Sequence, residues 1–370
     1  MWPDRRLLDL LGMEHPVIQA PMAGAQGSAL AAAVSEAGGL GSLPCGLFPA
    51  DYLRQEVQAI RRRTTRPFNL NFFCYAPPEP DEARAARWVE RLAPYRRELG
   101  IDAPAPSGGR GSGRGPFGDE SCALIEELKP PVVSFHFGFP PEAMVARVKA
   151  AGARVIASAT TVEEARWLAG HGADAIIAQG VEGGGHRAMF LTDEVASQPG
   201  TMALVPQVVD AVRVPVIAAG GIGDARGIAA ALMLGAAGAQ IGTAYLLTPE
   251  ATIPPIYRTA LKTAREDQTA ITNVFTGRPA RGIVNRAVRE IGPISADAPA
   301  FPGAMGAMLP LRLKAEAQGS GDFTSLWAGQ ALRFAREMPA GDLTRELVES
   351  TLALIRMWRA ASAQGAGSID

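Results

Sequence analysis

The sequence contains few cysteines, no excess of either charge and no long apolar run. Its three cysteines, Cys45, Cys74 and Cys122, are odd in number and lack metal-ligand spacing, which predicts reduced, buried thiols and no metal site. Lys and Arg number 36 against 37 Asp and Glu, a net charge of −1. This balance gives no electrostatic reason to expect nucleic acid or an anionic membrane as a partner, so a small molecule is the expected one.

The N-terminal residues argue against secretion, and the short length of the apolar stretches argues against membrane insertion. Residues 1–7 mix charged and apolar side chains and lack the apolar core and small-residue cleavage site of a signal peptide. Glycine, proline or charge interrupts each apolar stretch well before it could cross a bilayer. We therefore expect a cytoplasmic protein without a transmembrane segment. With 47% hydrophobic and 20% charged residues, the chain can bury a sizeable core.

Eight short β-rich runs, most of them followed by a helical pattern, dominate the first two thirds of the chain. They cover residues 17–22, 40–44, 68–73, 132–137, 154–159, 175–180, 215–221 and 239–246. Eight β/α units predict an α/β fold, a closed parallel (β/α)₈ TIM barrel, with a doubly wound open sheet as the alternative.

The length of this region fits one barrel of about 250 residues, so we assign residues 1–248 to the barrel and 249–370 to an appended helical region. The last segment places apolar residues at helical spacing, which predicts a packing face: Leu343, Leu347, Thr351, Leu354 and Trp358. Residues 104–118 are rich in Pro, Gly, Ser and Arg, which predicts a surface excursion before the fourth strand.

Two glycine turns lie where such a barrel commonly binds phosphate, after its seventh and eighth strands. The first is Ala218-Ala219-Gly220-Gly221-Ile222-Gly223-Asp224, and the second is Gln240-Ile241-Gly242-Thr243. Glycine lets the backbone approach an anion closely, and free N–H groups at a helix start attract phosphate. The alternative is two ordinary tight turns with a helix N-cap at Asp224.

A histidine follows three glycines in the loop after the sixth strand, Gln179 to Arg187. There His186 could enter the barrel mouth without crowding a bound ring, and histidine is well suited to acid–base work near neutral pH. The alternative is a flexible loop that carries a solvated His186–Arg187 pair.

The fourth strand places Ser134 and His136 on one face, opposite Val133, Phe135 and Phe137. This arrangement favours a site at the strand's carboxyl end, but a core histidine bonded to the backbone has the same pattern. Asn69 and Asn71 on the third strand have the same two interpretations, as site residues or as hydrogen-bonded core residues. We interpret His15 and His171 as structural or solvated.

Taken together, these segments resemble the nitronate monooxygenase family, FMN enzymes formerly called 2-nitropropane dioxygenases. The matching barrel segments are Gln19 to Gly24, Phe68 to Phe73, Val133 to Gly138, Gln179 to Arg187, Ala219 to Ile222 and Gln240 to Thr243. Two further matches, Thr276 to Gly282 and Leu326 to Gln330, lie in the C-terminal region.

The resemblance implies an FMN site and a catalytic centre. It implies His186 as the catalytic base and His136 as a residue near the substrate. The residues implied at the cofactor are Ala20, Pro21, Met22, Asn71, Gln179, Gly184, Gly185, Gly220, Gly221, Gln240, Ile241, Gly242 and Thr243. The family commonly has alanine at Gly183 and glycine at Ala188, and the aromatic residues often found in its C-terminal lid are hard to place near Pro299 to Pro310.

The implied reaction is oxidation of an alkyl nitronate or small nitroalkane with O₂ to a carbonyl compound and nitrite. The chain could also associate with further copies of itself as a homo-oligomer. One alternative enzyme is an NAD(P)H-dependent FMN reductase acting on quinones or enoyl-acyl-carrier-protein substrates, since related barrels share the glycine-histidine loop. A flavin-binding scaffold without turnover is the alternative outside enzymes.

Overall fold

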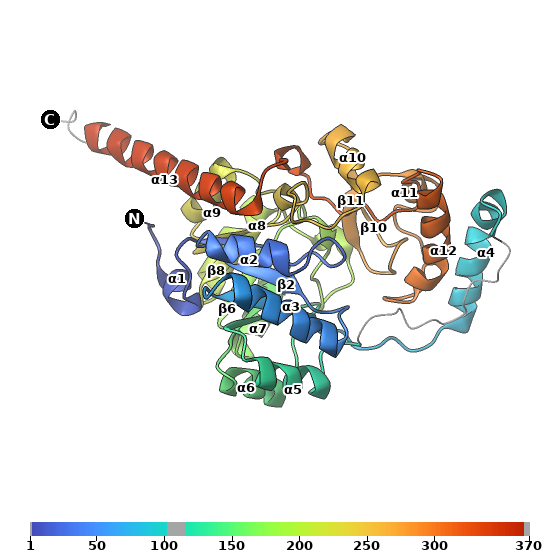
Figure 1. The fold of residues 1–370 in the computed structure, drawn as a ribbon, viewed down its shortest axis with the longest axis horizontal. Helices are drawn as coiled ribbons and strands as arrows, with labels where there is room; N and C mark the ends of the chain where they lie inside the picture. The colour runs from blue at the N-terminus through green and yellow to red at the C-terminus, as the bar shows by residue number, and fades with distance from the viewer. Residues whose placement is uncertain (1, 102–114, 366–370) are drawn as a thin grey trace.

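The computed structural model describes residues 2–101 and 115–365 and contains one eight-stranded parallel sheet (Figure 1). The strands run in the order β1-β9-β8-β6-β5-β4-β3-β2. Their bounds are β1 Val17–Gln19, β2 Gly41–Pro44, β3 Phe68–Phe73, β4 Val132–His136, β5 Arg154–Ala159, β6 Ala175–Gln179, β8 Val216–Ala219 and β9 Gly238–Ile241. Each predicted run overlaps one of these strands. The run at 239–246 is shorter as a strand, because a 3₁₀ turn, Thr243–Tyr245, follows β9.

The sheet closes on itself between β1 and β2. A parallel bridge joins Ile18 to Leu40, with hydrogen bonds of 2.9 Å from Leu40 N to Val17 O and from Gln19 N to Leu40 O. The predicted (β/α)₈ barrel is therefore confirmed, and the alternative of an open sheet is wrong. A closed ring brings the carboxyl ends of all eight strands to one mouth, where the loops that follow them meet.

Polar side chains occupy part of the barrel interior. Asn69 Nδ2 donates to Ser42 Oγ at 3.0 Å and to Ser134 Oγ at 2.8 Å, and Asn71 Nδ2 donates to Ser134 Oγ at 2.9 Å. Alternation along β3 and β4 turns these groups to the same side, away from Leu70 and Phe135. Their network lies below the mouth.

Helices pack around the barrel after most strands. They are α2 Ser28–Glu36, α3 Ala50–Arg63, α5 Asp119–Leu128, α6 Glu142–Ala150, α7 Val162–Gly170, α8 Thr201–Ala211 and α9 Ala225–Met233, after the short N-terminal α1 Arg6–Leu11. No long helix directly follows β9. The chain instead builds the C-terminal region and returns with α13, Ala340–Gly365, which packs on α2 and α9.

Helix α13 takes the place of the eighth barrel helix. Leu343 and Leu347 are buried in the barrel core, and Thr344 Oγ1 lies 2.8 Å from Tyr245 Oη. The predicted packing face is confirmed at Leu343, Leu347 and Thr351, whereas Trp358 is exposed. The distal part of α13 extends away from the body of the protein (Figure 1).

The C-terminal region is helical only in part. Helices α10 Pro255–Thr263, α11 Arg286–Glu290 and α12 Ala304–Ala317 accompany strands β10 Thr269–Thr272 and β11 Ala280–Ile283. These two strands are antiparallel, and β11 also pairs with β7, Gly185–His186, from the loop after β6. This small sheet was not predicted, and its strands β7, β10 and β11 have two, four and four residues. It attaches the C-terminal region directly to the histidine loop.

Helix α4, Glu82–Glu98, leaves the barrel after β3 and packs on α12 (Figure 1). Its Trp88 and Leu92 join a second core with residues of the C-terminal region, including Val274, Leu311 and Phe323. We call α4 together with residues 249–339 the lid. The lid is therefore assembled from two segments that lie far apart in the sequence.

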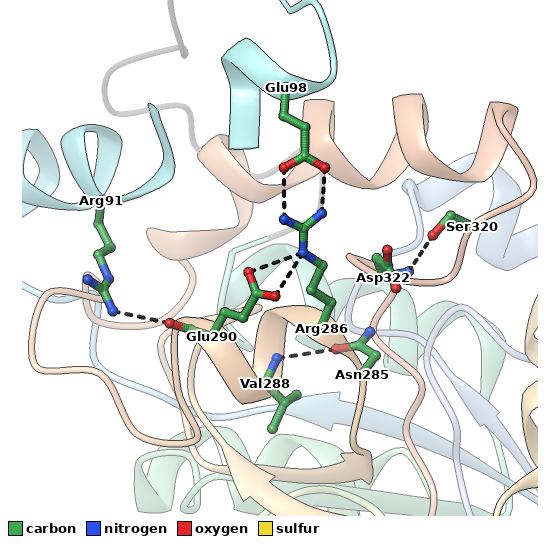
Figure 2. Close-up of polar contacts among 8 residues, drawn as sticks. All are labelled: Arg91, Glu98, Asn285, Arg286, Val288, Glu290, Ser320 and Asp322. Atoms are coloured by element: carbon green, nitrogen blue, oxygen red, sulfur yellow. Dashed lines mark hydrogen bonds and ion pairs between the residues drawn. The ribbon is translucent and has the colours of Figure 1, made fainter. Parts of the chain in front are cut away.

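One ion pair and one hydrogen bond join α4 to α11 (Figure 2). Arg286 forms a two-pronged pair with Glu98, at 2.6 and 2.8 Å, and its Nε also contacts Glu290. Arg91 Nη2 donates to the carbonyl oxygen of Glu290 at 3.2 Å. A two-pronged arginine–carboxylate pair fixes relative orientation as well as distance, so α4 and α11 are oriented as one unit.

Of the predicted excursion at 104–118, residues 104–114 lie outside the described residues. Phe117 N donates to Phe73 O at 2.8 Å, and the Phe117 ring packs on Phe72 and Phe135. The end of this segment is therefore part of the barrel wall. Among the helices of the described ranges, none combines the length and apolar character required to span a membrane.

Candidate active site

The turn after β8 has the backbone geometry expected for an anion site. Gly220 and Gly221 have φ of 106° and 69°, in the region that glycine enters without strain. Asp224 Oδ1 caps α9 by accepting from Arg226 N and Gly227 N at 3.1 Å each, as the alternative interpretation expected. Within the described chain the N–H groups of Gly221 and Ile222 donate no hydrogen bond, so they remain available to a ligand.

The turn after β9 lies beside the first strand's loop. A Cβ placed on Gly242 would lie 3.4 Å from Ala20 Cβ and 3.7 Å from Met22 Sδ, so this turn and the Ala20-Pro21-Met22 segment are in contact. Ala20 N donates to Ile241 O at 2.8 Å. The side-chain Oε1 of Gln240 is buried and has no hydrogen-bond partner among the described residues. An unpaired buried acceptor at this position is suited to a donor on a bound molecule.

The lid reaches the same turn through residues 328 and 329. Thr243 Oγ1 accepts from Gly329 N at 3.0 Å. A Cβ on Gly184 would lie 2.5 Å from Gly329 N, so the histidine loop and the lid backbone touch at a place that excludes a larger residue. Thr243, Gly184 and the lid are thereby fixed to one another.

The side chain of Gln179 forms two hydrogen bonds to the main chain of the histidine loop, residues 180–187, and of the residue that follows. Its Oε1 accepts from Ala188 N at 2.9 Å and its Nε2 donates to His186 O at 3.1 Å. Both ends of the amide are used, which fixes the main chain on either side of Arg187. Gly185 has φ of 71° and begins β7. The predicted cofactor residues Gln179, Gly184 and Gly185 therefore lie in one short segment at the mouth.

His186 is half-buried and enclosed by aromatic rings. Its ring centroid lies 5.5 Å from Phe137, 5.6 Å from Phe301 and 5.3 Å from Trp327. Its Nε2 lies 2.9 Å from the hydroxyl of Thr276. Burial lowers the pKa of His186 to about 3, and His136 and Arg278 nearby lower it further, so the imidazole is neutral at pH 7.

His136 touches the same loop. Its Nε2 lies 3.2 Å from His186 O, and because a carbonyl only accepts, this nitrogen carries the proton. Burial is the largest cause that lowers the pKa of His136 to about 3. His136 thus forms the backbone contact of the structural alternative, yet its ring also lies 4.6 Å from that of Phe137 at the mouth. The structure brings the two histidines together.

Arg187 is fully buried, so the interpretation as a solvated His–Arg pair is wrong. Its guanidinium donates to Gly180 O at 2.6 Å, Gln179 O at 2.7 Å and Gln198 Oε1 at 3.1 Å. Burial lowers the pKa of Arg187 to about 10, which leaves it charged. Its bonds join the end of β6 to the loop and hold His186 at the mouth.

An aromatic wall that the sequence did not reveal faces the histidines. Phe301 packs on Tyr75 at 5.0 Å and on Phe137 at 5.4 Å between ring centroids, and Phe73 lies 4.9 Å from Phe137. Arg278 places its guanidinium 4.2 Å from the centre of the Phe137 ring. Phe301 thus places an aromatic side chain of the segment 299–310, where the family's lid aromatics were hard to place from the sequence, against the other rings of the wall. The resembling segments include Phe73, Phe137, Arg278 and Trp327, whereas the sequence contained no signal for Tyr75 or Phe301.

The remaining predicted residues have simpler surroundings. Asn71 lies in the interior network with Ser134. His15 accepts a hydrogen bond from Trp2, and His171 stacks on Trp167 at the surface, so both fit the structural or solvated interpretation. All three cysteines are buried, and no disulfide joins them. In the described ranges no group of three or more His, Cys, Asp or Glu side chains is placed to hold a metal ion.

Known proteins share both the sequence and this architecture. The family model described as nitronate monooxygenase matches residues 4–350. A nitronate monooxygenase from Pseudomonas aeruginosa is 43% identical over 347 residues, covering 93% of this chain and 98% of that protein. The crystal structure of a nitroalkane oxidase from Streptomyces ansochromogenes has a TM-score of 0.85 and 42% identity, covering 95% of this chain and 99% of the other.

A second solved structure is more distant. FabK from Thermotoga maritima has a TM-score of 0.73 and 30% identity, covering 98% of this chain and all of the other. The barrel and lid arrangement is thus common to proteins that carry different names.

Proposed function

Because this chain belongs to the nitronate monooxygenase family and is therefore an oxidoreductase, we propose that it oxidises alkyl nitronates and small nitroalkanes with O₂. The products are a carbonyl compound and nitrite. A nitroalkane first loses its α-proton to become the electron-rich nitronate. The observation that carries the proposal is His186, a neutral imidazole held among aromatic rings at the mouth of the barrel.

FMN is the proposed cofactor, and the residues at the mouth fit it. The N–H groups of Gly221 and Ile222, with the turn at Gly242 and Thr243, suit its phosphate. The unpaired Oε1 of Gln240 suits a donor on the ring system. When bound, the flavin accepts electrons from the substrate and passes them to O₂. The remaining predicted contacts, from Ala20 to Met22, lie beside Gly242.

His186 removes the α-proton of a nitroalkane. A base must be unprotonated to act, and the burial that lowers its pKa to about 3 meets this condition throughout the neutral range. An anionic nitronate formed beside the ring would favour the imidazolium and raise that pKa during the reaction. The charge of Arg278, near both histidines, also favours the anion over the neutral nitroalkane.

The aromatic wall excludes water and sets the size of the substrate. Phe73, Phe137 and Phe301 form a continuous apolar surface opposite His186. Such a surface accepts the alkyl part of a small nitro compound and strengthens the electrostatic contacts of its charged part. His136 and Gln179, through their shared contact with His186 O, keep the base facing this surface.

Two measurements on the purified protein test this function. Anaerobic stopped-flow mixing with ethyl nitronate should bleach the flavin absorbance quickly, and aerobic turnover with nitroethane or its nitronate should release nitrite. The main competitor is an NAD(P)H-dependent FMN reductase, for which NADH or NADPH would bleach the flavin and nitronate would not. Rapid bleaching by a nicotinamide together with no nitrite release would refute the proposal.

A further inference from the structure

Thr276 makes a close side-chain hydrogen bond to the proposed base. Its hydroxyl lies 2.9 Å from Nε2 of His186, although the two residues are 90 positions apart in the sequence. The same hydroxyl lies 3.4 Å from both the carbonyl oxygen and the N–H of Arg278. Thr276 is buried, with 6% of its surface exposed, so water does not compete freely for these contacts.

The segment that carries Thr276 is held rigidly. Gly277 N donates to Asn273 O at 2.8 Å, and a Cβ on Gly277 would lie 1.9 Å from Pro299 O. On the other side, Phe275 is buried and packs on Trp327. The hydroxyl is therefore presented to His186 from a fixed position.

Hydrogen-bond accounting distinguishes the two neutral forms of His186. If Nε2 carries the proton, it donates to Thr276, and Thr276 can then donate to Arg278 O, so every N–H and O–H donor of this group has an acceptor. If Nδ1 carries the proton instead, Thr276 donates to Nε2, and no described residue accepts the Nδ1–H of this ring, whose neighbours are aromatic side chains. A donor left without a partner in an apolar site is costly, so the first form is favoured.

We propose that Thr276 is a positioning residue that fixes His186 in the Nε2-protonated form, so that the lone pair of Nδ1 faces the pocket and accepts the proton of the substrate. Nε2–H stays bonded to Thr276 before and after the transfer. The proton of the substrate carbon moves to Nδ1, and the electron pair of that C–H bond remains on the nitronate. The role of Nδ1 as proton acceptor rests on the proposed function, whereas the tautomer of His186 does not depend on that function.

The chain has only four histidines, which makes the tautomer directly observable. Protein labelled with ¹⁵N-histidine, with its flavin bound, should show His186 with a protonated Nε2 and a lone-pair Nδ1 at pH 7. The spectrum of His186→Asn identifies its signals by their loss. In Thr276→Val, which keeps the shape and removes the hydroxyl, the two forms should mix. Thr276→Ser should restore the wild-type pattern, and the signals of His136 should not change.

Kinetics supply a second readout. Thr276→Val should lower kcat/KM for nitroethane about tenfold, equivalent to about 1.4 kcal/mol, with little effect on its preformed nitronate. Thr276→Ser should stay near wild type with both substrates. If wild-type protein oxidises neither substrate, the proposed function fails while the spectra still decide the tautomer.

Two results would overturn the assignment. One is a wild-type His186 that carries its proton on Nδ1, and the other is a Thr276→Val spectrum identical to that of the wild type. If Thr276→Val does not fold, the wild-type spectrum alone still decides, with Thr276→Ser as the folded comparison.

Discussion

Lowering the pH from 7 to 5 should destabilise the fold through the two histidines at the barrel mouth. Burial holds the pKa of His136 and of His186 at about 3 in the folded protein, against an ordinary value of 6.5. In the unfolded chain the two imidazoles therefore bind protons as the pH falls through about 6.5, whereas in the folded chain they bind them only near pH 3. Stability is full above pH 6.5 and falls as the pH falls through this window.

The size of the effect follows from the two pKa values. In the steep part of the window each histidine costs about 1.4 kcal/mol per pH unit. Between pH 7 and pH 5 this amounts to about 2 kcal/mol for each histidine and about 4 kcal/mol for the pair. The pKa of His15 is also lowered, mainly by burial, so it adds a loss of the same sign.

Urea denaturation at pH 7, 6 and 5, followed by far-ultraviolet circular dichroism, measures this loss as a change in the free energy of unfolding. His136→Asn and His186→Asn each remove one titrating group, and each variant should lose about 2 kcal/mol less than the wild type between pH 7 and 5. His171→Asn is the matched control, because His171 lies at the surface against Trp167, and it should keep the full loss.

The reasoning would be refuted if both variants at the mouth showed the same pH dependence as the wild type. That outcome would mean that the two imidazoles take up protons in the folded protein near pH 6. Burial would then not be the reason that His186 is neutral at pH 7.

Three further outcomes are expected. His186→Asn, which cannot accept a proton at neutral pH, should lower nitroalkane turnover about 10²- to 10⁴-fold and nitronate turnover much less; equal losses with an unchanged flavin spectrum would argue against a base. Gly184→Ala should lower the unfolding free energy by about 1–3 kcal/mol, measured by urea denaturation, because its Cβ would meet Gly329 N at 2.5 Å. Gly221→Val should weaken FMN binding at least about tenfold in a fluorescence titration, since φ of 69° strains a branched residue and its Cβ would lie 3.3 Å from Glu182; unchanged affinity would remove this turn from the phosphate site.

The sequence determined the barrel and the outline of its mouth. Strand signals are local, because alternation and β-branched residues act over a few neighbours, and eight such runs could be found one by one. Glycine turns are also local, so Gly220, Gly221 and Gly242 could be located from the sequence. His186 stood out because three glycines precede it. These features needed no knowledge of which segments meet.

Only the tertiary structure decided what surrounds His186. Thr276, Phe301 and Trp327 come from the C-terminal region and reach the histidine through short strands, tight turns and a shared core that leave no periodic pattern. Arg187 is polar and follows three glycines, so the alternative interpretation of the loop left it solvated, yet carbonyl groups and Gln198 satisfy its donors inside the protein. Burial and hydrogen-bond partners depend on segments far apart in the sequence, and these set the pKa and the proton position of the base.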